Sequence, residues 1–318
     1  MRPAVSAGFV YPNERDWLQL ALSAAFAGFL QPILIGPEAR IREAADHAGL
    51  DISRLPIANT PDSTAEAAAC AIELARAGKV KALVRGSLAN EDLIGPLAAS
   101  ASGLRTHHRL SHACFVELPG RAQALLIADS LLNGTPTLGA KKDIVANTVE
   151  LAEAIGIAAP RVAILSAVGM AHQAYPSSLD ADALKAMAAQ GAFGQAVVDG
   201  PLTADVALSA DIARAVGVTS EVAGHADVLL APSMESAALM LRTMTALTGG
   251  FAAGVVIGAR LPLVLPTRME SMEARMASCV LASLHANHER PRHSSPPPAR
   301  TWPDEPTTIS GHVAAQRS

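Results

Sequence analysis

The chain has 318 residues, of which half are hydrophobic and only 3% aromatic, and its formal net charge is −4. This length is sufficient for two α/β domains with a substantial core. The small negative charge, without a long run of Lys or Arg, excludes long-range attraction to nucleic acid or an acidic membrane, and the scarcity of aromatic residues argues against a base-stacking surface. Cys70, Cys114 and Cys279 form no CxxC pair, so neither a disulfide framework nor a structural zinc site is predicted.

The amino-terminal stretch MRPAVSAGFVYPNERDW has no long apolar core and no small-residue cleavage site. It is therefore not predicted to be a signal peptide. Every long apolar stretch is interrupted by a charge, Pro or Gly before it reaches the roughly 18 residues that a spanning helix needs. We expect a cytoplasmic protein that has no membrane partner.

Short apolar runs alternate with helical patterns along most of the chain, which predicts βα units around a largely parallel sheet. In the first half, strands are expected at 4–10, 32–35 and 80–84, and helices at 14–29, 38–48, 64–77 and 90–99. The runs 113–116 and 124–127 predict a hairpin through Pro119-Gly120. A long helix near 140–156 opens a second series, with strands at 162–165, 196–198 and 228–230 and helices at 180–190, 203–216 and 234–247.

The stretch Phe251–Ser278 contains two apolar runs, Ala253–Ile257 and Leu261–Leu265. Both are short and bounded by Gly or Pro, which favours buried strands. Thr267 and Arg268 follow the second run, just before an amphipathic helix. A hydroxyl and a guanidinium at that place suit an anion. The alternative is that Thr267 only caps the helix and Arg268 is a solvated first-turn residue.

Polar residues interrupt the pattern at four predicted strand ends, namely Arg85-Gly86-Ser87, Ser111-His112, Ala128-Asp129-Ser130 with Asn133, and Thr267-Arg268-Met269-Glu270. Each one alone reads as a cap or a turn. Their shared placement predicts a common crevice, because the carboxyl ends of parallel strands lie at one edge of a sheet. Nearby, the segment 105–109 (RTHHR) lacks acidic or Cys partners at metal-ligand spacing, so phosphate binding through Arg105, Arg109 and Ser111 is favoured over a metal.

A set of segments resembles the phosphate acetyl/butyryltransferase family, particularly the transferase half of bacterial proteins that fuse an enoyl-CoA hydratase to a phosphate acetyltransferase. The segments occur in the family order over about residues 32–282: QPILIGPEARIREAADHAGLD, RAGKVKALVRGSL, GLRTHHRLSHACFVELP, AKKDIVANTVELAEAIGI, RVAILSAV, PSSLDADALKAM, VDGPLTADVALS, GHADVLLAP and GVVIGARLPLVLPTR. No single segment is specific, but together they are.

The resemblance implies an α/β fold like that of isocitrate and isopropylmalate dehydrogenases, with a second α/β domain inserted into the first. The expected domains are residues 1–143 plus 261–287 and residues 144–260, with the strand at Leu261 returning to the first sheet. The strands at 162–165 and 228–230 are then expected in a separate sheet. Residues 288–318, which are rich in Pro and lack periodicity, are predicted to be a disordered tail.

The resemblance also implies an enzyme that moves an acetyl or short-chain acyl group between coenzyme A and inorganic phosphate, usually as a homodimer. Coenzyme A is then a substrate, and neither a cofactor nor a metal is expected. By position, Arg268 would hold the phosphoryl group, Thr267 would bind the carbonyl oxygen, and Glu270 or Glu273 would be the base. The residues Arg85, Arg105, Ser111, His112, Asp129 and Asn133 would line the substrate site.

This chain departs from the pattern of the family at several polar positions. Gly169, Ser233 and Ala238 stand where relatives have Glu, Asp and Asn. Two alternatives follow from these departures and from the fold. One is a catalytically weakened paralogue that binds acyl-CoA or phosphate in a regulatory or assembly role. The other, a fold-related dehydrogenase or decarboxylase, needs a metal-binding Asp set and a dinucleotide site that this sequence lacks.

Overall fold

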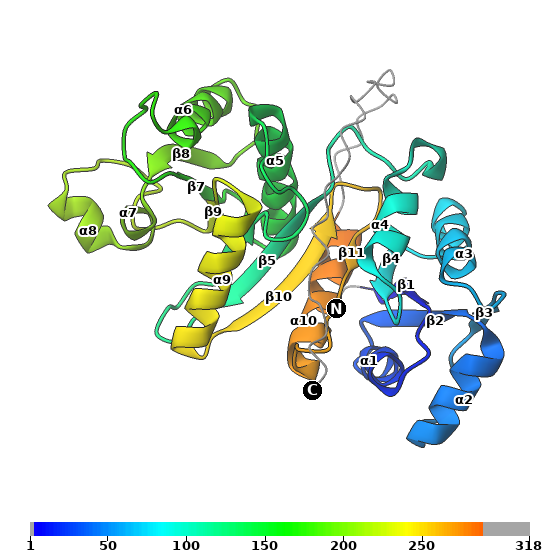
Figure 1. Ribbon diagram of the computed structural model, residues 1–318. Helices are drawn as coiled ribbons and strands as arrows, with labels where there is room; N and C mark the ends of the chain where they lie inside the picture. The colour runs from blue at the N-terminus through cyan, green and yellow to red at the C-terminus, as the bar shows by residue number, and fades with distance from the viewer. Residues whose placement is uncertain (1–2, 289–318) are drawn as a thin grey trace, which may run out of the picture.

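The computed structural model describes residues 3–288. Its centre is one mixed sheet of eleven strands in the order β3-β2-β1-β4-β11-β10-β5-β6-β9-β7-β8 (Figure 1). The strands are mostly buried apolar runs: β1 (Val5–Val10), β2 (Leu30–Gly36), β3 (Ile57–Asn59), β4 (Ala82–Arg85), β5 (Ser111–Glu117), β6 (Leu125–Ala128), β7 (Arg161–Leu165), β8 (Val197–Leu202), β9 (Val228–Leu230), β10 (Phe251–Ile257) and β11 (Leu263–Val264).

Helices follow most of the strands, as the alternating pattern predicted. They are α1 (Arg15–Phe26), α2 (Glu38–Ala48), α3 (Thr64–Arg76), α4 (Asn90–Ala98), the 3-10 turn Ser100–Ser102, α5 (Leu138–Ala154), α6 (Pro176–Ala189), α7 (Ala204–Leu208), α8 (Ala210–Ala215), α9 (Met234–Thr248) and α10 (Met272–Ala286). Hydroxyl side chains at Ser63, Thr137 and Ser233 cap α3, α5 and α9. Such caps satisfy backbone N–H groups that have no partner within the helix.

The two faces of the sheet are covered differently. On one face α2, α1, α10, α5 and α6 pack on a continuous core that runs from Leu34 to Leu184. On the other face the core divides into two clusters. The first lies under α3 and α4 and includes Leu83 and Val256, and the second lies under α7 and α9 and includes Cys114 and Ile127. The long strands β5 and β10 connect the two halves of the molecule (Figure 1).

The return of the chain to the first half of the sheet is confirmed. In β11, Leu263 and Val264 pair in parallel with Leu83 and Val84 of β4. The predicted hairpin is also present, with β5 antiparallel to β6. The expectation of a separate second sheet is wrong, because β6 pairs with β9, which pairs with β7. The sheet is therefore continuous across both halves, and the domain boundaries at 143 and 261 stay predictions.

The strands do not share one direction, which corrects the expectation of a common carboxyl edge. β10 is antiparallel to both β11 and β5, and β6 is antiparallel to β5. As a result β6, β9, β7 and β8 run opposite to β1, β2, β4 and β11. Arg85 ends β4 and Asp129 follows β6, so the chain leaves the sheet at opposite edges at these two residues. The polar residues near them approach each other only because β4, β6 and β11 are short.

No helix within residues 3–288 combines the length and apolarity required to cross a membrane. Of the predicted tail, 288–318, all residues after His288 lie outside the described part of the chain.

Candidate functional site

His112 lies where the core on one face of the sheet divides into its two clusters. It is the second residue of β5, half-buried, and directly opposite Val256 of β10. Its ring lies over Gly254, where an added Cβ would be 2.5 Å from Nε2 of His112. The absence of a side chain at Gly254 therefore makes room for the imidazole ring between the two clusters.

The imidazole is held by two neighbours on β5 and in the loop after β6. Nδ1 of His112 is 2.9 Å from Oγ of Ser130 and 3.7 Å from Sγ of Cys114. The same Ser130 Oγ is 3.4 Å from Sγ of Cys114. Burial by itself lowers the pKa of His112, but Cys114, Asp129 and Glu270 together raise this pKa above the usual value for histidine. His112 is therefore more readily protonated than an ordinary histidine.

Asp129 shapes the loop that carries Ser130. It is 3% exposed, and its Oδ1 accepts hydrogen bonds from the backbone N–H groups of Leu131 and Leu132, each at 2.9 Å. Asn133 donates to the other carboxylate oxygen and to the carbonyl of Leu110 at 2.9 Å. These contacts give Asp129 and Asn133 a structural part in placing Ser130 beside His112.

Arg85 approaches the same region from the end of β4. Its guanidinium donates to the carbonyls of Leu88, at 2.6 Å, and of Pro266. Burial lowers the pKa of Arg85, while the charge of Glu270 raises it and that of Arg268 lowers it. Glu270 is thus within electrostatic range of both Arg85 and His112.

The segment Thr267–Glu270 forms a turn that is closed by its own residues. The N–H of Thr267 donates to Oε2 of Glu270 at 3.1 Å, and the N–H of Glu270 donates to the carbonyl of Thr267 at 3.3 Å. Helix α10 begins later, at Met272, and Ser271 is its cap. The alternative in which Thr267 caps the helix is therefore wrong. Arg268 lies before the helix and not in its first turn.

The buried side chain of Arg275, on α10, holds the Thr267–Glu270 turn through hydrogen bonds. Its Nε donates to the carbonyl of Thr267 at 3.0 Å, its Nη2 to that of Arg268 at 3.1 Å, and its Nη1 to Asp16 at 3.0 Å. The guanidinium groups of Arg275 and Arg85 lie 5.1 and 5.8 Å from the ring of Trp17, within the range of cation–π attraction. Arg268 itself points outward, 67% exposed, and is paired with Glu14. The described residues thus leave most of the Arg268 guanidinium open to solvent.

Three of the predicted site residues lie apart from this group. Ser111 is fully buried, and its Oγ accepts a hydrogen bond from Asn147 of α5 at 2.8 Å, on the face opposite His112. Arg105 is exposed and donates to Ser100 at 3.0 Å. Glu273 is exposed in the first turn of α10, where a negative charge interacts favourably with the helix dipole.

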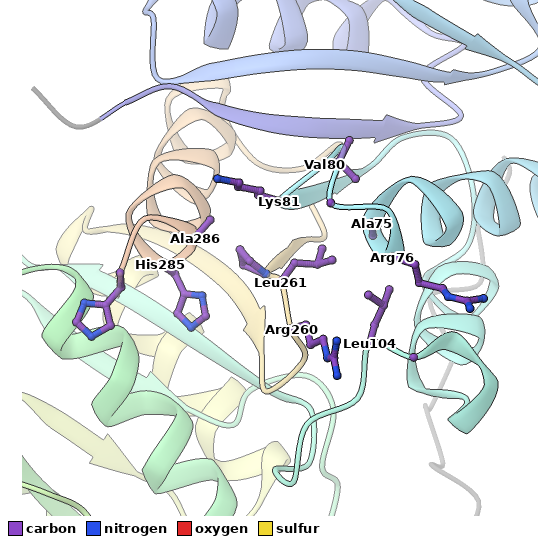
Figure 2. Close-up of a pocket in the computed structure, with 13 residues that line it drawn as sticks. Ala75, Arg76, Val80, Lys81, Leu104, Arg260, Leu261, His285 and Ala286 are labelled. Carbon is purple, nitrogen blue, oxygen red and sulfur yellow. The ribbon is translucent and has the colours of Figure 1, made fainter. Parts of the chain in front are cut away.

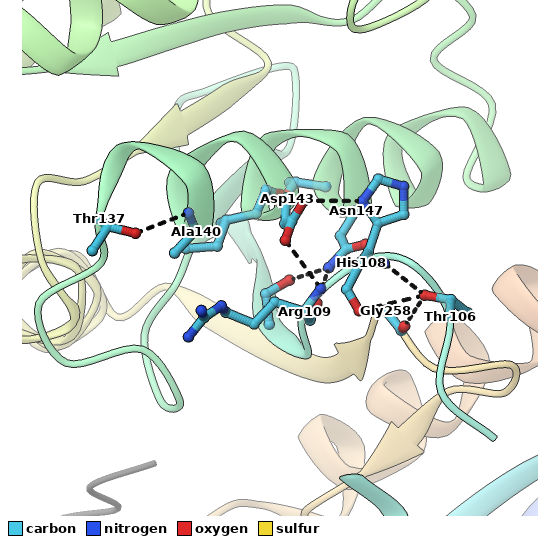
Figure 3. A network of polar contacts seen from close by, with 11 residues as sticks. Thr106, His108, Arg109, Thr137, Ala140, Asp143, Asn147 and Gly258 are labelled. Carbon is cyan, nitrogen blue, oxygen red and sulfur yellow. Dashed lines mark hydrogen bonds and ion pairs between the residues drawn. The ribbon is translucent and has the colours of Figure 1, made fainter. Parts of the chain in front are cut away.

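Polar side chains hold the segment before β5 against α5. The N–H of Arg109 donates to Asp143 at 3.2 Å, His108 lies 3.4 Å from the same carboxylate group, and Asn147 donates to the carbonyl of Arg109 at 2.8 Å (Figure 3). This network accounts structurally for part of the His- and Arg-rich patch. No cluster of His, Cys, Asp or Glu suited to a metal ion occurs among residues 3–288.

The close packing of His112 on Gly254 gives a stability prediction. In Gly254→Ala the new methyl would lie 2.5 Å from Nε2 and 2.6 Å from Cε1 of His112. We expect the ring to shift and the free energy of unfolding to fall by about 1–3 kcal/mol, measured by chemical denaturation. Gly139→Ala is the matched control, because an added Cβ there has no neighbour within 4 Å. Equal stability of the two variants would contradict this account of Gly254.

The comparison with known proteins bears on this arrangement. The sequence profile of the phosphate acetyl/butaryl transferase family matches residues 62–283, which span β4, the β5–β6 hairpin and the turn after β11. The chain belongs to this family. It is 43% identical over 288 residues to a phosphate acetyltransferase of Rhizobium meliloti, covering 91% of this chain and 90% of that protein.

Other relatives are named for a different acyl group. The chain is 36% identical over 277 residues to a phosphate butyryltransferase of Clostridium acetobutylicum, covering 87% of this chain and 92% of that protein. Among solved structures, a branched-chain phosphotransacylase from Enterococcus faecalis superposes with a TM-score of 0.78 at 25% identity, covering 90% of this chain and all of that one.

The fold class is confirmed by structures outside the family. A 4-hydroxythreonine-4-phosphate dehydrogenase from Klebsiella pneumoniae superposes with a TM-score of 0.55 at 14% identity, covering 91% of this chain and 99% of that one. This likeness concerns the fold alone. It agrees with the dehydrogenase-like α/β architecture that the sequence resemblance implied for the transferase family.

Two of the positions at which the sequence was expected to depart from the family, Ser233 and Gly169, have different surroundings. Ser233 caps α9 through a reciprocal capping box with Ser236, a role that Asp also fills. Gly169 is exposed beside a cavity of about 520 Å³ that contains the Lys185–Asp199 ion pair of 2.7 Å. An added Cβ at Gly169 would have no neighbour within 4 Å. A larger side chain at this position is therefore sterically compatible with this fold.

Proposed function

We propose that this transferase-family member moves an acyl group between coenzyme A and inorganic phosphate, in the reaction acyl-CoA + phosphate = acyl phosphate + CoA. The observation that carries the proposal is the family match over residues 62–283, which includes the turn of Thr267 and Arg268. The substrates would meet between Arg268, Arg85 and His112, where cationic or readily protonated groups surround Glu270.

In the direction of acyl-CoA synthesis, the thiol sulfur of coenzyme A attacks the carbonyl carbon of the acyl phosphate. The C–S bond forms as the bond from that carbon to the phosphate oxygen breaks, and phosphate leaves with the bonding electron pair. Glu270 is our candidate for the base that takes the thiol proton, with Glu273 as the second candidate. Thr267 would donate a hydrogen bond to the carbonyl oxygen, on which negative charge develops.

Phosphate would be held by Arg268, whose planar fork of donors matches phosphate oxygens. The pKa of His112 is raised, so its protonated form would add positive charge beside β5. Arg85 donates to the carbonyl of Pro266, next to Thr267, so we assign it a part in placing the turn. Asp129 and Asn133, which are hydrogen-bonded to each other, would orient Ser130. Ser130 would in turn orient the imidazole of His112.

The relatives are named for acetyl, butyryl or branched-chain acyl groups. We therefore expect a short acyl group, either acetyl or a short branched or unbranched chain. Coenzyme A enters as a substrate, and we assign no cofactor. A homodimer, a cytoplasmic location and the division into residues 1–143 plus 261–287 and residues 144–260 remain predictions from the sequence resemblance.

The proposal is tested by incubating the full chain with acetyl-, propionyl-, butyryl- and isobutyryl-CoA, with and without phosphate or arsenate, and measuring release of free CoA. We expect release that requires phosphate or arsenate and favours one acyl length. Arsenate reports the same transfer because acyl arsenates hydrolyse spontaneously. CoA binding by calorimetry without turnover on any of the four thioesters would support the weakened paralogue instead.

A further inference from the structure

A second cavity lies at the opposite end of the same two strands that carry the proposed site. Its volume is about 640 Å³, within the usual range for small-molecule sites. Lys81 lines it immediately before β4, and Pro262 immediately before β11. Arg85 is the last residue of β4, and Thr267 comes shortly after the end of β11. The cavity and the proposed site are thus separated by the lengths of β4 and β11.

The lining of this cavity is basic. Arg76, Lys81, Arg260, His285 and His288 contribute to it, and no Asp or Glu does (Figure 2). Each of the first three is exposed. Their side chains make no hydrogen bond or ion pair with any other residue in 3–288. The ends of these three side chains point in different directions around the cavity (Figure 2). Their positive charges have no carboxylate partner among residues 3–288, so they favour a bound anion.

His285 supplies a second, independent observation. It lies on the last turn of α10, is 3% exposed, and lines the cavity (Figure 2). Its Nε2 is 3.3 Å from Oε1 of Glu150, and its Nδ1 has no hydrogen-bond partner within residues 3–288. A buried polar nitrogen without a partner is costly. An oxygen atom of a ligand in the cavity would provide the missing partner.

We propose that this basic cavity binds a small anion with at least two negative charges, either a phosphate compound or a polycarboxylate. Its anionic oxygens would contact Lys81 and Arg260 on one side and His285 on the other. This site is distinct from the proposed acyl-transfer site. The proposal does not depend on acyl transfer, and its test measures binding instead of turnover.

The test is calorimetric titration of the full chain, at low ionic strength, with inorganic pyrophosphate in one arm and citrate in the other. We expect at least one of the two probes to bind. The double variant Lys81→Gln/Arg260→Gln should weaken that binding at least tenfold. Lys79→Gln is the matched control, because Lys79 is exposed two residues from Lys81 and does not line the cavity. The affinity of Lys79→Gln for the probe should stay within about twofold of that of the original chain, because the charge of Lys79 is screened by solvent.

Arg268→Ala separates this cavity from the proposed phosphate site and should retain the binding. If only one of the two probes binds, the result shows whether the ligand belongs to the phosphate or the carboxylate class. The proposal is overturned if neither probe binds. It is also overturned if binding survives in the double variant, whether or not Arg268→Ala retains it. Thermal melting of each variant, expected to match that of the original chain since all the changed side chains are exposed, shows that the fold is intact.

Discussion

Arg268→Ala is expected to lower kcat/KM for phosphate by roughly 10²–10³-fold, the loss that accompanies removal of a donor to a charged transition state. The guanidinium is exposed and supported by Glu14, so its removal leaves the core untouched. Arg268→Lys should recover only part of the activity, because an ammonium restores the charge but not the fork of donors. Initial rates at varied phosphate concentration are the measurement.

Two controls separate phosphate binding from a structural part of Arg268. Arg242→Ala removes an exposed arginine on α9 and should leave kcat/KM within twofold. Glu14→Gln removes the ion-pair partner of Arg268. Exposed ion pairs contribute only up to about 1 kcal/mol, so a purely structural role predicts small and equal losses in Arg268→Ala and Glu14→Gln. Such equality would contradict the assignment of Arg268 to phosphate.

Glu270→Gln is expected to reduce turnover by a hundredfold or more, with partial recovery at high pH, where the CoA thiolate forms without a base. The change is conservative for the structure, because the Gln side-chain oxygen can still accept the N–H of Thr267 that Glu270 accepts at 3.1 Å. A large loss would therefore report the missing carboxylate and not a disordered turn. The measurement is a pH profile of turnover from about pH 6 to 9, a range that spans the usual titration of a thiol.

Glu273→Gln is the matched comparison for Glu270→Gln. Glu273 is exposed in the first turn of α10, so its loss should remove only a favourable interaction with the helix dipole, about 0.3–1 kcal/mol of stability. Nearly unchanged turnover is expected. A severe loss in Glu273→Gln together with a silent Glu270→Gln would move the role of base to Glu273. Silence of both variants would require a base from another part of the chain.

Local patterns in the sequence were sufficient to place most strands and helices. The apolar runs at Ala253–Ile257 and Leu261–Leu265 are β10 and β11, and Pro119-Gly120 joins the predicted hairpin. Which strands pair across the sheet depends on contacts between distant residues. The pairing of β6 with β9 made the sheet continuous, and the antiparallel pairing of β5 with β6 reversed the direction of the strands beyond it. Neither property is encoded in the periodicity of any one segment.

The candidate site shows the same division between local and distant information. Ser111 and His112 are consecutive in β5 and so point to opposite faces. The predicted strand, 113–116, began too late to show this. No pattern in the sequence indicated that Arg275 or Trp17 belongs to the candidate site. Arg275 acts through backbone carbonyls of the Thr267 turn, and its contact with Trp17 joins residues 258 positions apart in numbering. Only the folded chain brings them together.

The place of the β10–β11 hairpin has a consequence for the order in which the protein is made. This hairpin fills the position between β4 and β5, although both of these strands are synthesised more than a hundred residues earlier. Until Val264 has left the ribosome, the nascent chain carries two unpaired strand edges, one on β4 and one on β5. Such edges are templates for pairing with other chains. Fragments that end before Phe251 should therefore aggregate instead of forming a smaller folded unit, and final assembly of this sheet has to follow synthesis of its last hairpin.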